Sequence, residues 1–425
     1  MFSRSSYFDG MSRRRSIAVD PLEVFADEFA QDVARDPFVD DFGQADEAEE
    51  PVKLIEAVAP SYEAPSDVVP PAPRKGRGAV TNVAGRYERF AQERVDDGWQ
   101  RAEDEEPRLR TTVAIDASRT VIARNQSPDV PFDRSINPYR GCEHGCVYCF
   151  ARPTHAYLGL SPGLDFESRL FAKQDAPALL RKELAAKGYT CQPIALGTNT
   201  DPYQPVERER KITRGILEVL AEHEHPVTIV TKSDLIVRDL DILGPMAAKG
   251  LASLSMSVTT LDRDLARLME PRASTPEKRL AAIRACAAAG VPSGVLVAPI
   301  IPAVNDSEIE AILERAHGEG ARHAAWVLLR LPLEIKDLVE EWLHTHFPDR
   351  AERVLSLVRQ SRGGALYKAE WGKRMSGEGP YAHMISQRFR RTCQKLGLGR
   401  RMGGLDTSRF TVPAAVSRQM SLFEG

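Results

Sequence analysis

Between residues 135 and 330, short apolar segments alternate with longer amphipathic ones. Val227-Thr-Ile-Val-Thr is β-branched throughout, which is typical of a buried strand. Residues 276–289 have helical spacing, with Thr275 as a predicted N-cap and Gly290 just past the end. The whole region predicts strands at 135–137, 193–196, 227–231, 254–259, 295–301 and 324–329. Helices are predicted between them, at 176–187, 212–224, 235–249, 276–289 and 307–319, the last with Asp306 as its cap.

Six strands separated by five helices indicate a parallel α/β fold. Because the first strand leads directly into a loop rich in cysteine, the pattern fits an open, partial (β/α)6 barrel over residues 135–330. In β/α barrels the chemistry lies on the loops that follow the strands. The loops after the predicted strands are therefore where functional side chains are expected.

The flanks differ from the barrel in composition. Residues 1–75 are acidic and rich in proline and alanine, which predicts a disordered tail. Residues 76–134, with strand-like pieces at 111–116 and 120–123, are predicted to pack on the barrel as a lead-in segment. Residues 331–412 predict a helical extension with helices at 335–346 and 351–360, followed by a flexible tail, 413–425.

Charge and cysteine content bound the class of protein. The net charge of −3 hides an asymmetry, because thirteen Lys and Arg between residues 350 and 401 face only three acidic residues. No apolar run is long enough to span a membrane, and the first residues do not form a secretory signal. Six cysteines without a pairing framework favour a reducing, cytoplasmic location. Cys191, Cys286 and Cys393 are predicted to be small buried side chains.

The strongest chemical signal is the stretch from Asn137 to Phe150. It places Cys142, Cys146 and Cys149 in a C-x3-C-x2-C triplet. Three thiolates so close together can hold one face of a [4Fe–4S] cluster, which normally has four thiolate ligands, so that one iron stays open. A structural zinc site, completed by His144 or His155, is the alternative.

The triplet, with the aromatic Tyr148 before its third cysteine, resembles the signature of the radical S-adenosylmethionine (SAM) enzymes. The resemblance implies that the amino and carboxylate groups of SAM bind the open iron. It also implies reductive cleavage of SAM to a 5′-deoxyadenosyl radical. An external electron donor such as flavodoxin or ferredoxin would reduce the cluster.

Polar side chains follow the other predicted strands, where SAM would need them. Asn199, Thr200 and Asp201 are candidates for the SAM ammonium and nearby groups. Lys232 and Arg272 supply cations and Ser257 a hydroxyl, while Pro299 and Ile300 could form a shelf for adenine. Each has an ordinary alternative: Asp201-Pro202 also suits a turn, and Arg272 a surface ion pair.

Longer runs narrow the resemblance to the spore photoproduct lyase branch, whose members are often described as DNA repair photolyase-like. These runs are Gly197-Thr-Asn-Thr-Asp-Pro, Thr231-Lys-Ser-Asp-Leu, Glu270-Pro-Arg-Ala-Ser-Thr-Pro and Val297-Ala-Pro-Ile-Ile-Pro. Further runs suggest a bacterial subgroup: Lys75-Gly-Arg-Gly-Ala, Gly85-Arg-Tyr-Glu and Arg152-Pro-Thr-His. The resemblance implies that Thr200, Lys232 and Ser257 contact SAM.

One departure separates the chain from the lyase reaction. In spore photoproduct lyase a cysteine in the loop after the second strand donates a hydrogen atom, but residues 197–201 contain none. Cys191 precedes that strand and is expected at the opposite end of the barrel. SAM cleavage is unaffected by this difference, whereas repair of a thymine dimer is put in doubt.

Two C-terminal features favour a nucleic-acid substrate. Aromatic side chains lie among the basic residues of the extension, and Arg388-Phe-Arg-Arg391 is the densest group. Gln419-Met-Ser-Leu-Phe423 resembles the peptide by which bacterial repair proteins dock on the DNA sliding clamp. The alternatives are a solvated basic face and a tail that packs on its own domain. A radical SAM enzyme acting on a protein or small metabolite, and a non-catalytic zinc-binding DNA adaptor, also remain open.

Overall fold

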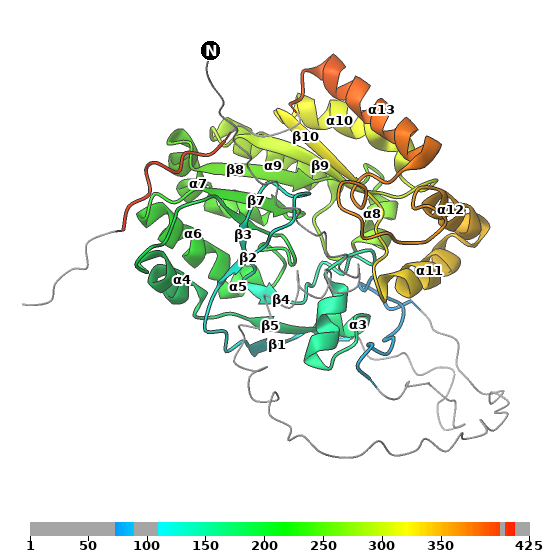
Figure 1. Ribbon diagram of the computed structural model, residues 1–425, viewed down its shortest axis with the longest axis horizontal. Coiled ribbons are helices and arrows are strands. Elements are labelled where there is room, and N and C mark those ends of the chain that lie inside the picture. The colour runs from blue at the N-terminus through cyan, green and yellow to red at the C-terminus, as the bar shows by residue number, and fades with distance from the viewer. Residues whose placement is uncertain (1–72, 89–108, 400–403, 413–425) are drawn as a thin grey trace, which may run out of the picture.

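The fold is built on a seven-stranded sheet, seen in a computed structural model that describes residues 73–88, 109–399 and 404–412. The strand order is β10-β9-β8-β7-β6-β3-β2 (Figure 1). β2 (Ile122–Arg124) is antiparallel to β3, and the other six strands are parallel. They are β3 (Arg134–Ile136), β6 (Ile194–Leu196), β7 (Val227–Thr231), β8 (Ala252–Ser257), β9 (Ser293–Ile300) and β10 (His323–Leu328). The order is linear rather than closed, which confirms the predicted partial (β/α)6 barrel.

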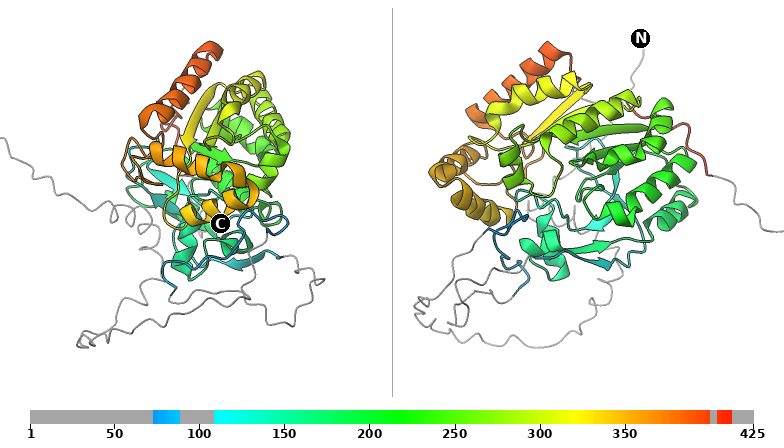
Figure 2. Two further views of the ribbon diagram at one scale, coloured as in Figure 1. Left: turned by 90° about the vertical axis from the view of Figure 1, so that its right-hand side faces the viewer. Right: turned by 180° about the vertical axis from the view of Figure 1, so that it is seen from behind.

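Helices connect the strands in the predicted alternation and lie along the outer side of the sheet (Figures 1 and 2). They are α4 (Ala176–Leu184), α6 (Ile212–Glu222), α7 (Leu240–Ala248), α9 (Pro276–Ala288) and α10 (Ile309–Gly318). The 3-10 helices η2 (Asp234–Asp239) and η3 (Asp306–Glu308) precede α7 and α10. Short helices α5 (Glu207–Arg210) and α8 (Arg263–Met269) follow β6 and β8.

Of the two predicted helix caps, one is confirmed in its position and the other is wrong. Thr275 is the N-cap residue of α9 and has extended backbone, although its side chain makes no capping hydrogen bond. Asp306 lies inside η3, and its carboxylate accepts a hydrogen bond from the Tyr381 hydroxyl at 2.7 Å. The prediction of Gly290 just past α9 is confirmed by its positive φ of 76°, which glycine adopts without strain.

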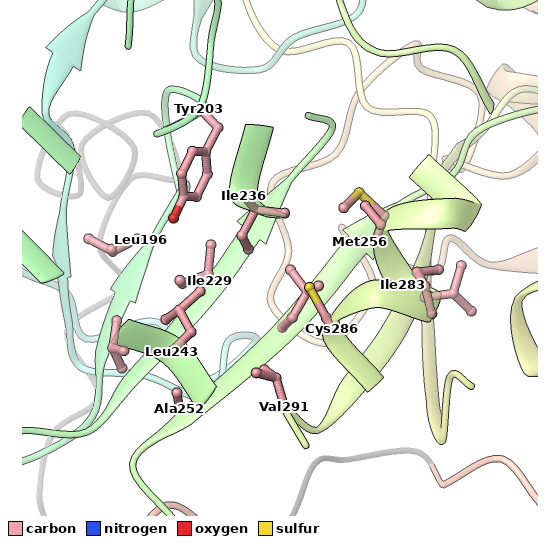
Figure 3. Close-up of a cluster of buried hydrophobic side chains, with 14 of the residues drawn as sticks. Leu196, Tyr203, Ile229, Ile236, Leu243, Ala252, Met256, Ile283, Cys286 and Val291 are labelled. Carbon is pink, nitrogen blue, oxygen red and sulfur yellow. The ribbon is translucent and has the colours of Figure 1, made fainter. Parts of the chain in front are cut away.

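The main core lies between the sheet and the outer helices. On β7, Val227 and Ile229 point to this core and are fully buried, whereas Thr228 and Val230 point inward and are only half-buried. Figure 3 shows Ile229 near Leu243 of α7, with Cys286 of α9 in the same cluster. Burial raises the pKa of the Cys286 thiol to about 12, as expected for the structural role that its sequence position predicted.

The inner face of the sheet carries small side chains along its centre. The register sets Ser255 of β8 between Val230 of β7 and Gly294 of β9, and it sets Ser257 beside Leu296. Residues paired in parallel strands point to the same face. A closed β/α barrel fills its interior with bulky branched side chains. The serines and the glycine here fill less of that space, which favours a ligand on the inner face.

A second, three-stranded sheet fixes where the cysteine loop begins. β1 (Thr112–Ile115) is parallel to β5 (Arg169–Ala172), and β4 (Tyr139–Arg140) is antiparallel to β5. β1 confirms the strand predicted at 111–116. The structure also contains η1 (Arg152–Leu158) and α3 (Leu164–Ser168), which were not predicted.

Three helices follow the barrel: α11 (Ile335–His346), α12 (Pro348–Gln360) and α13 (Gly379–Leu396). The first two were predicted, and α13 was not. α13 packs along α10 (Figure 1), and its Phe389 ring lies 6.1 Å from the Trp326 ring of β10. None of the helices among the described residues is long and apolar enough to cross a membrane.

Two predictions concern residues that the structure does not describe. Nearly all of the acidic tail predicted at 1–75 lies outside the described ranges. The tail 413–425, with its clamp-like motif Gln419–Phe423, also lies outside them. The domain boundaries at 75, 134, 330 and 412 stay predictions.

Candidate active site at the cysteine loop

The three cysteines of the triplet lie together on the loop that follows β3 and β4, at the carboxyl end of the parallel strands. All three are free thiols. Cys146 and Cys149 join a hydrophobic cluster with Tyr148, and Cys142 and Cys149 contact a second one around Phe166. One short loop therefore gathers three sulfur donors, as the spacing predicted.

Each of the two histidines that could complete a zinc site has one ring nitrogen bound within the protein. Among the described residues, no three His, Cys, Asp or Glu side chains are arranged to hold one metal ion. Of the two candidate fourth ligands, His144 turns Nδ1 to Asp201 at 3.3 Å, and His155 turns Nε2 to the Arg169 carbonyl oxygen at 3.0 Å. In a cubane each thiolate binds a different iron, so the sulfurs stand further apart than around one zinc.

The protein environment makes these thiols poor acids in the absence of iron. Burial raises the pKa of Cys146 to about 12, against the opposing positive charge of Lys232. Burial also raises the pKa of Cys149, although Arg152 and Lys232 oppose the shift. Iron must therefore displace the protons, which makes cluster assembly pH-dependent.

Hydrogen bonds connect the loop after β6 to the cysteine loop and to the strand before it. The Asn137 side-chain oxygen accepts the backbone N–H of Asn199 at 3.0 Å. Gln204, fully buried, accepts the Glu143 N–H at 2.8 Å and donates to the Gly141 carbonyl at 3.2 Å. These bonds join residues about 60 positions apart, at two neighbouring strand ends. The backbone on both sides of Cys142 is thus held in one conformation.

Asp201 links the loop after β6 to the end of β7 and to the cysteine loop. Its carboxylate accepts hydrogen bonds from the Thr231 hydroxyl and the Lys232 N–H, both at 2.7 Å, and from the Tyr203 N–H at 2.9 Å. It also faces His144. Burial alone would raise the pKa of Asp201, but the His144 ring and these bonds outweigh it and lower the pKa to about 2. Its predicted contact with the SAM ammonium stays a prediction.

The other predicted SAM contacts fall into two groups. Three already have protein partners: the Thr200 hydroxyl donates to the Tyr139 carbonyl at 2.9 Å, the Ser257 hydroxyl donates to the Ala298 carbonyl at 3.3 Å, and Arg272 pairs with Glu143 at 3.0 Å. Because Glu143 is buried, this pair differs from the surface ion pair that the sequence offered as the alternative.

The second group has side chains without such partners. Lys232 lies over the Tyr148 ring, with Nζ 5.9 Å from its centre, and Nζ has no hydrogen bond or ion pair within the described ranges. Asn199 likewise makes only a backbone hydrogen bond there. Pro299, near the end of β9, is buried. Their contacts with SAM stay predictions.

Sequence reasoning missed a buried carboxylate beside the cysteines. Glu270 accepts hydrogen bonds from the Tyr148 hydroxyl and from Arg279, and it accepts a third from Thr259 at 3.0 Å. Burial would raise the pKa of Glu270, yet the positive charges of Arg279 and Lys232 hold it below its usual range. The run beginning Glu270-Pro-Arg signalled the position but not its partners.

A second missed pair, Arg152 and Glu167, is completely buried and orients the cysteine loop. Arg152 donates to the Cys146 carbonyl at 2.8 Å and to the Gly145 carbonyl at 3.1 Å. Glu167 accepts the backbone N–H groups of Gly78 and Ala79 at 2.9 and 2.8 Å. The pair therefore ties the lead-in segment to the cysteine loop.

Gly78 is required by this contact. A Cβ at Gly78 would stand 1.7 Å from the Gly145 carbonyl oxygen, a backbone atom that no side-chain rotation can move. Gly78→Ala is therefore expected to destabilise the fold by about 1–3 kcal/mol, the usual range for overpacking. The shift of the urea unfolding midpoint measures the effect.

Gly318→Ala is the matched control for this substitution. Gly318 ends α10, and a Cβ there would meet nothing within 4 Å. The control is expected to be neutral or slightly stabilising, because alanine favours helix over glycine. Equal midpoints for the two variants would refute the close approach of residues 78 and 145.

Comparisons with known proteins agree with this site. A model of the radical SAM superfamily matches residues 136–316. Uncharacterized protein Rv2578c of Mycobacterium tuberculosis is 37% identical over 243 residues, which cover 56% of this chain and 72% of the relative. An uncharacterized protein of Methanocaldococcus jannaschii is 28% identical over 174 residues, covering 41% of this chain and 62% of that one.

The chain also aligns with solved structures. A spore photoproduct lyase complexed with dinucleoside spore photoproduct aligns with 68% of this chain and 80% of its own, at 17% identity and a TM-score of 0.47. A radical SAM methyltransferase, TsrM from Kitasatospora setae with cobalamin and a [4Fe–4S] cluster bound, aligns with 50% of this chain and 39% of its own, at 14% identity and a TM-score of 0.34.

The sequence matches identify the class. The chain belongs to the radical SAM superfamily. Members of this superfamily use a [4Fe–4S] cluster and SAM, as the cysteine triplet predicted.

Proposed function

We propose that Cys142, Cys146 and Cys149 hold one [4Fe–4S] cluster with an open iron for SAM, and that the chain acts on nucleic acid. One observation carries the first part of the proposal. Three free thiols share a loop at the carboxyl end of six parallel strands, within eight residues of one another. A set of three thiolate donors fits a [4Fe–4S] cluster with one iron left open.

The chain's own residues would position and shield the reaction. When bound, the cluster supplies the electron that cleaves SAM. Arg152 and Gln204 fix the backbone of the cysteine loop through its carbonyl and N–H groups. Tyr148, held by Glu270, covers one side of the loop with an aromatic ring. A rigid, apolar surround of this kind excludes water from a reactive species.

Among the candidate SAM contacts, Lys232 has the strongest support. Its ammonium lies near Cys146 and Tyr148 and has no hydrogen-bond or ion-pair partner of its own in the described part of the chain. A cation in this position suits the SAM carboxylate. Asn199, Ser257 and Pro299 complete the proposed contact set at the ends of β6, β8 and β9. Thr200, Asp201 and Arg272 are proposed to act chiefly by bracing the site.

Only part of the basic run predicted from the sequence supports binding to nucleic acid. In Arg388-Phe-Arg-Arg391, Arg388 is paired with Glu310 at 2.6 Å, and Phe389 is buried against Trp326. Arg390 and Arg391 are exposed on α13, without ion-pair partners within the described ranges. These two guanidiniums, rather than the whole run, support contacts with phosphates.

Binding to single- and double-stranded DNA across a salt series tests the substrate class. The reconstituted protein is expected to bind, with an affinity that falls linearly on a logarithmic scale as salt rises. The variant carrying Arg390→Gln and Arg391→Gln is expected to show a shallower salt dependence. If the protein binds neither form at low salt, the substrate is a protein or a small metabolite instead.

A further inference from the structure

Arg330 stands beside the cysteine loop, at the end of the sixth parallel strand. It lies two residues after β10, in the position where β/α barrels carry functional groups. Its neighbours Leu329 and Leu331 belong to the same hydrophobic cluster as Cys146 and Tyr148. The backbone that bears Arg330 is thus packed against the proposed active site.

The Arg330 guanidinium lies close to two aromatic rings. Its carbon lies 5.4 Å from the centre of the Phe150 ring and 6.0 Å from that of Tyr367. Phe150 directly follows Cys149, so one face of the guanidinium is fixed by the cysteine loop itself. Stacking on aromatic rings orients a guanidinium while leaving its N–H groups free to bind in their own plane.

The polar groups of Arg330 are poorly satisfied. One terminal nitrogen reaches the Met375 sulfur at 3.5 Å and the other the Tyr367 hydroxyl at 3.4 Å, while the buried Nε has no hydrogen-bond partner. No carboxylate lies within ion-pair distance of Arg330 in the described part of the chain. Leaving the buried Nε–H of a charged side chain unsatisfied costs free energy, and native structures rarely do so without a functional reason.

Several buried arginines among the described residues are paired with a carboxylate, whereas Arg330 has no such partner there. Arg152 is paired with Glu167, Arg279 with Glu270, and Arg374 with Asp129. A second guanidinium lies close by. Arg362 donates to the carbonyl of the adjacent Leu329 at 2.9 Å, and burial, together with the positive charge of Arg330, lowers the pKa of Arg362 to about 10. Two cations close together attract an anion to this spot.

We infer that Arg330 binds a backbone phosphate of a nucleic-acid substrate and thereby positions that substrate at the cysteine loop. A planar guanidinium binds two phosphate oxygens through parallel hydrogen bonds. Tyr367 and the 45% exposed Trp371 lie on the segment between α12 and α13, where they offer rings for unstacked bases. The inference rests on the proposed nucleic-acid function and names a contact that carries it.

The experiment compares Arg330→Gln and Arg330→Lys in the reconstituted protein, with a fluorescent single-stranded DNA oligonucleotide of mixed sequence as the probe. Arg330→Gln is expected to weaken binding about tenfold and to lower the slope of log affinity against log salt by about one. Arg330→Lys should keep that slope while losing part of the affinity, because lysine retains the charge but lacks the two parallel N–H donors of the guanidinium. Arg284→Gln, on the exposed surface of α9, is the matched control and should bind as the wild type does.

The outcomes separate this inference from the proposed function. If the wild type binds and Arg330→Gln binds equally well, the Arg330 contact is wrong while the nucleic-acid function stands. If the wild type does not bind at low salt, the nucleic-acid function itself fails. A raised KM for SAM with unchanged oligonucleotide affinity would assign Arg330 to the SAM carboxylate and overturn the inference.

Discussion

Replacing Cys146 by alanine is expected to abolish assembly of the iron–sulfur cluster. The proposed site has only three thiolates, and losing one leaves two ligands where a [4Fe–4S] cluster normally has four. Anaerobic reconstitution followed by iron and sulfide analysis measures the effect. The wild type is expected to hold about four irons per chain, and the variant close to none.

Cys191→Ala is the matched control, because Cys191 precedes β6 and lies away from the cysteine loop. It should assemble the cluster as the wild type does. Full iron content in Cys146→Ala, or equal loss in both variants, would contradict the assignment of the three ligands. Cys142→Ala and Cys149→Ala should behave as Cys146→Ala does.

Arg152→Met is expected to cost about 3–5 kcal/mol of folding stability. The substitution leaves Glu167 buried without its counter-charge, and it removes the donors that hold the carbonyls of Gly145 and Cys146. Burying an unpaired carboxylate is among the most destabilising single changes in proteins. Urea unfolding of the unreconstituted protein measures the loss, and a reduced yield of cluster should accompany it.

Arg284→Met provides the comparison for this prediction. Arg284 pairs with Glu319 through exposed side chains, and such pairs contribute little. No measurable shift in the urea midpoint is expected for it. Similar midpoints for Arg152→Met and Arg284→Met would show that the buried pair does not stabilise the cysteine loop.

The barrel could be predicted because its signals are local. Val227-Thr-Ile-Val-Thr is apolar and β-branched, and proline and glycine mark the two ends of α9. The helix α13 was missed because its basic residues obscure the apolar stripe of Ala382, Ile385 and Phe389. Short strands such as β4 show no period at all, since pairing with a distant strand creates them.

Some features of the candidate site could be predicted from the sequence and others could not. The cysteine triplet lies within eight residues, so its spacing alone indicated the chemistry. The roles of Asp201 and Thr200 depend on partners that are distant in sequence, such as His144 and Tyr139. A polar residue at a strand end is visible in the sequence, but the bonds it already makes are not.

Partners that are distant in sequence also decide which arginines of the basic C-terminal stretch are neutralised. Its charge excess is real in the sequence, yet Arg388 and Arg374 are neutralised by Glu310 and Asp129 from other parts of the chain. By contrast, Arg330 gave no signal because a single arginine after a strand is common. Arg330 is distinguished by the nearby rings of Phe150 and Tyr367 and by the lack of a carboxylate partner among the residues that the structure describes.

The central claim is that the cysteine loop supports reductive cleavage of SAM. The most direct test is the formation of 5′-deoxyadenosine by the anaerobically reconstituted protein, with SAM and dithionite, compared with Cys146→Ala. The account predicts 5′-deoxyadenosine from the wild type and none above background from the variant. A colourless wild-type protein that holds one zinc ion and yields no 5′-deoxyadenosine would contradict it.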